Sequence, residues 1–74
     1  MKKLTPAQIV GRTMRERRKA IGISQDDMAD LIAMHRAYYS AIERGEKNIT
    51  LTTLKRIAEG LGTSMADLVG SADP

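Results

Sequence analysis

The sequence predicts a single all-α domain over residues 1–74, built from five short helices. Three features predict this fold class. Apolar residues recur at helical intervals, a residue able to cap a helix stands before each apolar stretch, and no stretch alternates between polar and apolar as a strand would. Because the chain has no Cys, packing must hold the helices together without disulfides or thiolate zinc sites.

The first helix is expected over about 6–20. Thr5 can cap it, Pro6 suits its first position, and Gln8 can complete a capping box. Gly22 is expected to end it. The residues that share its inward stripe are Val10, Met14 and Ile21.

A helix-turn-helix is expected over about 24–44. Ser24 can cap the second helix, and Asp26 and Asp27 lie in its first turn, where the helix dipole favours acids. The helical pattern breaks near Ala33 and resumes in a third helix from about 35 to 44, which Gly45 ends. The inner sides of the two helices are expected to hold Met28, Ala29, Ile32, Tyr39 and Ile42.

Two further helices are expected over about 50–70, and we expect them to mediate dimerisation. Thr50 can cap the first and Ser64 the second. The first has apolar residues at helical spacing, namely Leu51, Leu54, Ile57, Ala58 and Leu61. The expected dimer contacts are Leu61, Met65, Leu68 and Val69. Leu61 and Leu68 have an alternative role, which is to complete the core of the monomer.

Composition and charge narrow the class of protein. The net charge is +3, the first 20 residues carry seven bases and one acid, and residues 58–74 carry three acids and no base. A basic amino end indicates a polyanionic partner, although basic runs also form ordinary solvated faces. With one His, no Cys and no glycine-rich phosphate loop, we expect no enzyme. No apolar run could span a bilayer and no signal peptide is recognisable, so the expected location is cytoplasmic.

The third helix has an outer side suited to DNA. The second and third helices are short and joined by only a few residues, so they are expected to cross steeply. The third helix can then project into a DNA major groove, which is about 12 Å wide. Its outer side is expected to present Arg36, Ala37, Ser40 and Ala41, which include no acid. Because DNA phosphates repel carboxylates, an acid-free side favours close approach to a duplex.

The run S-Q-D-D-M-A-D-L-I-A-M-H-R-A-Y-Y-S-A-I-E-R-G-E-K-N-I-T resembles the helix-turn-helix of the lambdoid phage repressor and Cro family, also called the XRE family. The piece H-R-A-Y-Y-S-A-I-E-R-G-E-K-N is similar to controller proteins of restriction-modification systems. The resemblance implies a five-helix, lambda-repressor-like domain that binds operator DNA as a homodimer and regulates transcription. From the residues we also expect no cofactor, no metal, no small-molecule ligand and no membrane contact.

The resemblance also implies roles for residues that face DNA. Gln25 matches a glutamine that holds a DNA phosphate, although it can also be a plain first residue of its helix. Arg36 matches the position that most often contacts a base edge, where a guanidinium can bind guanine O6 and N7 together, with a phosphate contact as the alternative. Ala37 and Ala41 match base-facing positions, where a methyl group can touch thymine or simply permit approach.

Other matched positions surround these. Tyr39 matches a buried family position and is expected in the core with its hydroxyl at the rim, so that Tyr38 points toward the DNA backbone. The loop after the third helix matches one that follows the sugar-phosphate backbone, with an exposed hairpin as the alternative; its residues are Arg44, Lys47 and Asn48. Arg18 and Glu43 match a structural ion pair that joins the first and third helices.

Two positions depart from the family pattern. Ala33 stands where the turn usually has a Gly of positive φ, which would cost about 1 kcal/mol unless the turn differs. His35 stands where Ser or Thr usually caps the third helix, and we expect it to act as a cap or a backbone contact.

A competing function is that of an antitoxin, a helix-turn-helix protein whose main role is to bind a protein partner.

Overall fold

The computed structural model describes residues 3–70, and within this range it contains five helices and no strand. Along the chain these are α1 (Pro6–Ile21), α2 (Gln25–Leu31), α3 (Arg36–Glu43), α4 (Leu51–Leu61) and α5 (Met65–Val69). The all-α class and the five predicted helices are therefore confirmed. The ends of the predicted 1–74 domain, residues 1–2 and 71–74, lie outside the described residues.

Each helix begins at a polar side chain that accepts a backbone N–H of the first turn. At α1 the capping box is complete, because Gln8 N donates to Thr5 Oγ1 at 3.1 Å and Thr5 N donates to Gln8 Oε1 at 2.9 Å. At α3, His35 Nδ1 accepts from Ala37 N at 3.3 Å, which confirms the predicted cap. The remaining caps are Ser24, Thr50 and Ser64. Caps of this kind contribute about 1 kcal/mol each, so the sequence fixes where the helices begin.

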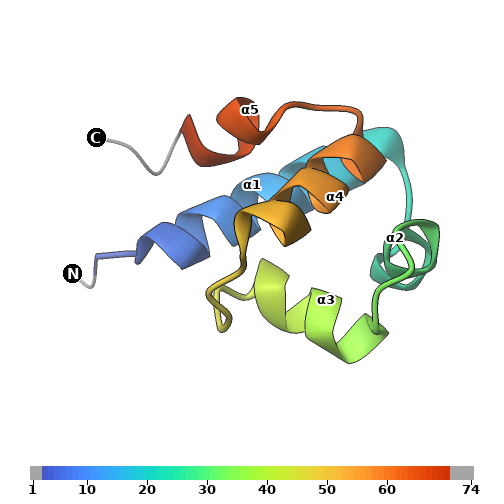
Figure 1. The fold of residues 1–74 in the computed structure, drawn as a ribbon, viewed down its shortest axis with the longest axis horizontal. Helices are drawn as coiled ribbons and strands as arrows, with labels where there is room; N and C mark the ends of the chain where they lie inside the picture. Colours follow the sequence, from blue (N-terminus) through green and yellow to red (C-terminus); the bar gives the residue numbers. More distant parts are fainter. Residues whose placement is uncertain (1–2, 71–74) are drawn as a thin grey trace.

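The helices enclose one core. Figure 1 shows α1 running through the middle of the molecule, with α3 on one side of it and α5 on the other. α1 contacts α3, α4 and α5, while α2 packs on α3 and α4 packs on α5. The largest fully buried side chains are Tyr39, Met14, Met28, Ile57 and Leu68. This arrangement leaves α2 and α3 together at one end of the molecule, away from α5 (Figure 1).

Two apolar residues that the sequence pattern predicted to be inward are exposed. Ile21 is 50% exposed and Leu51 is 74% exposed. The inward stripe of α1 continues from Met14 to the buried Arg18, four residues on, so the polar Arg18 takes the place that an apolar side chain was expected to fill. Ile21 ends α1 and Leu51 begins α4, and residues at helix ends have fewer neighbours to cover them.

Gly11 sets how closely α1 approaches α3. A Cβ built on Gly11 would lie 2.4 Å from the carbonyl oxygen of Glu43 and 2.7 Å from that of Ile42. Only a residue without a side chain allows this contact. The carboxyl end of α3 is therefore pressed against α1.

Candidate nucleic-acid interface

The turn between α2 and α3 has the left-handed geometry that the family pattern implied. Ala33 has a φ of +53°, so this chain accommodates the strained conformation with a residue other than Gly. Arg56 of α4 supports the turn, because its Nη2 donates to the carbonyl oxygens of both Ile32 and Ala33. Sequence reasoning missed Arg56, since no local pattern connects it with a turn 23 residues earlier.

A buried ion pair joins α1 to the end of α3, as predicted. Arg18 Nε donates to Glu43 Oε2 at 2.8 Å, and Arg18 Nη2 donates to Glu43 Oε1 at 3.2 Å. Gln25 Nε2 donates to the same Oε1 at 2.9 Å, which ties the start of α2 to the pair. Although burial opposes the charged form of Glu43, these hydrogen bonds hold its pKa below the ordinary value.

Tyr39 is buried more deeply than expected. Its side chain has no exposed surface, and its hydroxyl has no hydrogen-bond partner among residues 3–70, so the expectation that the hydroxyl reaches the rim was wrong. The ring lies beside the Arg18–Glu43 pair, and burial raises the pKa of Tyr39.

The outer side of α3 is exposed only along its first half. Arg36, Ala37 and Tyr38 are exposed, and Ser40 is partly buried. Ala41 is only 6% exposed, so its predicted base-facing position was wrong. The reason is that α1 meets the carboxyl end of α3 at Gly11, which buries that half of the helix and leaves its amino end exposed.

Two bases near this side, Arg36 and Arg44, have acidic or polar partners. Arg36 Nη1 lies 2.9 Å from Asp26 Oδ2, between two exposed side chains. Arg44 donates through Nε to Glu46 Oε2 at 2.8 Å and through Nη1 to Ser40 Oγ at 2.7 Å. The outer side of α3 itself has no acid, as the sequence predicted. Two carboxylates nevertheless lie close to its bases: Asp26 of α2 and Glu46 of the loop after α3.

The other predicted phosphate contacts surround this side. Gln25 is partly buried at the start of α2, with its side-chain amide bound to Glu43. Lys47 and Asn48 are exposed in the loop between α3 and α4. Arg15 of α1 was not singled out from the sequence, yet it lines a groove together with Arg18 of the same helix and with residues in or next to α2 and α3: Ser24, Gln25, Asp26, Ser40 and Arg44. The run of bases in the first 20 residues was the signal that could have identified it.

The predicted dimer contacts divide into two groups. Leu61 is 5% exposed and Leu68 has no exposed surface, so both complete the monomer core, and their predicted place in a dimer interface was wrong. They pack inward because α5 folds back against α1 and α4. Met65 is partly buried and Val69 is 37% exposed, so these two remain available.

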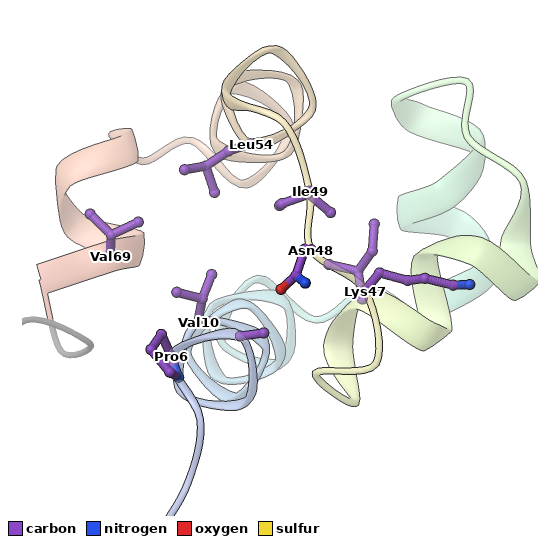
Figure 2. A pocket seen from close by; sticks show the side chains of 9 residues that line it. Pro6, Val10, Lys47, Asn48, Ile49, Leu54 and Val69 are labelled. Atoms are coloured by element: carbon purple, nitrogen blue, oxygen red, sulfur yellow. The ribbon is translucent and has the colours of Figure 1, made fainter.

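An apolar cavity of about 210 Å³ opens beside α5. Figure 2 shows Val10, Leu54 and Val69 pointing into it from α1, α4 and α5, while Lys47 extends away from it.

No group of three or more metal-ligating side chains occurs within residues 3–70. In the same range no helix is long and apolar enough to cross a membrane.

The short α2, the tight turn and the projecting α3 are the geometry of a helix-turn-helix protein. A family model described as helix-turn-helix matches residues 14–68, and the chain belongs to this family.

Several similar proteins are controller proteins of restriction-modification systems. The chain is 36% identical over 62 residues to the control protein C.SmaI of Serratia marcescens, across 84% of this chain and 74% of that protein. The crystal structure of the restriction-modification controller protein C.AhdI from Aeromonas hydrophila superposes with a TM-score of 0.80 at 32% identity, covering 84% of this chain and 94% of that one. The controller protein C.Esp1396I, solved as a tetramer with its natural 35 base-pair operator, gives a TM-score of 0.81 at 27% identity, covering 95% and 92%.

Proposed function

We propose that this protein is a transcriptional regulator that binds operator DNA as a homodimer, in the manner of a restriction-modification controller protein. The observation that carries the proposal is the exposed amino end of α3, where Arg36, Ala37 and Tyr38 project beside a partly basic groove. A helix end of this shape fits a major groove. Membership of the helix-turn-helix family and the similarity to C.SmaI support the same conclusion.

The proposed contacts follow from position on the surface. Arg36 begins α3 and contacts a guanine edge, and Ala37 beside it permits approach or touches a thymine methyl group. Tyr38 is 38% exposed and donates a hydrogen bond to a phosphate. The remaining backbone contacts come from Arg15, Gln25, His35, Ser40, Arg44, Lys47 and Asn48.

The proposal needs two copies of the chain. One short helix contacts only a few base pairs, so specific binding requires two half-sites about 34 Å apart on one face of the duplex. Val69 and Met65 lie on α5, on the side of α1 opposite α3 (Figure 1), so a contact there leaves the DNA side free. The apolar part of the cavity beside Val69, next to Val10 and Leu54, offers surface to the partner copy. Lys47 and Asn48, which are proposed to contact DNA, line the same cavity, so the partner contact must be confined to the part beside α5.

The test is selection of preferred sites from a random duplex library, followed by titration of a selected site and a random duplex at about 50 and 200 mM salt. Phosphate contacts make the affinity for both fall steeply with salt. We expect Arg36→Ala to reduce discrimination between the two duplexes and Lys47→Ala to weaken both alike. Failure to enrich any site, with no salt-dependent binding, would remove the proposed function.

A further inference from the structure

Arg36 is held by an acid of the neighbouring helix. Its Nη1 lies 2.9 Å from Asp26 Oδ2, although 70% of the Arg36 side chain and 57% of the Asp26 side chain are exposed. Asp26 belongs to the first turn of α2, and Arg36 is the first residue of α3. The ion pair therefore joins the two helices of the helix-turn-helix at an exposed point.

This pair does little for the stability of the fold. Exposed ion pairs contribute little, because water screens the charges and holding two long side chains costs entropy. The fold already joins α2 to α3 by other means, including the bond from Gln25 to Glu43 and the turn at Ala33. The contact of Asp26 with Arg36 is therefore not required for folding and can serve another role.

Asp26 also opposes DNA binding in general. It lines the same groove as Gln25, Ser40 and Arg44, the residues expected to follow the phosphate backbone. A carboxylate there is repelled by phosphates and lowers the affinity for DNA of any sequence. Asp26 also restrains the Arg36 side chain before DNA binds. Because fixing a flexible side chain at an interface costs conformational entropy, a side chain that is already restrained loses less entropy on binding.

We propose that Asp26 is a specificity-determining residue that positions the Arg36 guanidinium for a base edge, so that it lowers affinity for DNA in general while raising discrimination between sequences. The inference rests on the proposed function. One guanidinium nitrogen is occupied by Asp26, and no bond from Nε or Nη2 of Arg36 occurs within residues 3–70. These two nitrogens remain free as a pair of donors for the two acceptors of guanine.

Asp27 provides a matched control. It lies in the same first turn of α2, carries the same charge and is exposed, but it forms no ion pair within the described part of the chain. Its backbone N–H donates to Ser24 Oγ at 3.0 Å, a contact that substitution of its side chain leaves in place. Asp26→Ala and Asp27→Ala therefore remove the same charge from the same helix turn. They differ in the contact with Arg36 and in the groove, which Asp26 lines and Asp27 does not. Because repulsion of phosphates acts on every sequence alike, only the contact with Arg36 is expected to change discrimination.

The experiment measures affinity for a selected site and for that site with one base pair changed, for wild type and both variants. We expect Asp26→Ala to reduce discrimination by roughly two- to tenfold, the cost of fixing one free side chain. Asp27→Ala should leave discrimination unchanged, and both variants should bind random duplex DNA more tightly than wild type. Asp26→Glu, which keeps the charge, should retain part of the discrimination.

A double-mutant cycle completes the test. In an Arg36→Ala background, Asp26→Ala should cause no further loss of discrimination, because the group that it positions is gone. Equal effects of Asp26→Ala and Asp27→Ala on discrimination would overturn the proposal, as would a gain of discrimination in Asp26→Ala, which would mean that Asp26 masks Arg36. If the wild-type protein does not bind DNA at all, the proposed function itself is wrong, independently of the role of Asp26.

Discussion

Replacing Arg18 with Ala should destabilise this fold far more than replacing its neighbour Arg17. Arg18 makes both hydrogen bonds of a bidentate pair with Glu43, whose side chain is only 2% exposed. Without Arg18 the Glu43 carboxylate stays buried with the Gln25 amide as its remaining partner. Breaking one side of a buried pair costs about 3–5 kcal/mol. Arg17 is 47% exposed and lies 3.9 Å from Asp67, so its loss should cost about 0–1 kcal/mol.

The assay is thermal unfolding followed by circular dichroism at neutral pH. For a domain of this size, about 1 kcal/mol corresponds to a shift of roughly 4–8 °C. Arg18→Ala should therefore lower the melting temperature by at least about 12 °C, and Arg17→Ala by no more than about 8 °C. All variants are compared at one protein concentration, because the proposed dimerisation would make the melting temperature depend on concentration.

A third variant separates loss of the pair from loss of side-chain packing. If an unpaired buried charge causes the destabilisation, then replacing Arg18 and Glu43 together with apolar residues of similar size should recover much of the lost stability. Equal melting temperatures for Arg18→Ala and Arg17→Ala would refute the reasoning. So would a double variant no more stable than Arg18→Ala alone.

Four further outcomes are expected. Ala33→Gly should raise the free energy of unfolding by about 1 kcal/mol in urea titrations, because Gly accepts positive φ without strain. Gly11→Ala should lower it by about 1–3 kcal/mol, since the new methyl group meets the Glu43 carbonyl oxygen. Because the pKa of Glu43 is lowered from 4.5 in the fold, the stability from its pair is present above that pH and should be lost as pH falls below it, measured by urea titration from about pH 6 to 3. Val69→Glu should shift sedimentation from dimer to monomer while circular dichroism stays unchanged.

Helix positions were predictable because their causes are local. Thr5, Ser24, Thr50 and Ser64 each accept a backbone N–H three residues ahead, so the signal and its effect lie within one turn. The resemblance to a known family supplied one long-range contact, the pair of Arg18 and Glu43.

Burial near helix ends was not predictable in the same way. Ala37 and Ala41 share one side of α3, yet only Ala37 is exposed, because the contact of α1 with the end of α3 decides which half projects. Leu68 has the spacing of either a core or an interface residue, and the placement of α5 decides between them. Arg56 acquires its role only when α4 meets a turn 23 residues earlier in the chain, and Asp26 only when α2 and α3 pack together.

The most direct test of the account is the map of backbone amide signals that move when an isotope-labelled sample is titrated with its selected duplex. We predict that the largest changes fall at the amino end of α3, at the start of α2 and in the loop over 44–48, while the buried residues of α5 stay unchanged. Changes concentrated on α4 and α5, with the amides of Arg36, Ala37 and Tyr38 unmoved, would contradict the claim that α3 enters the duplex.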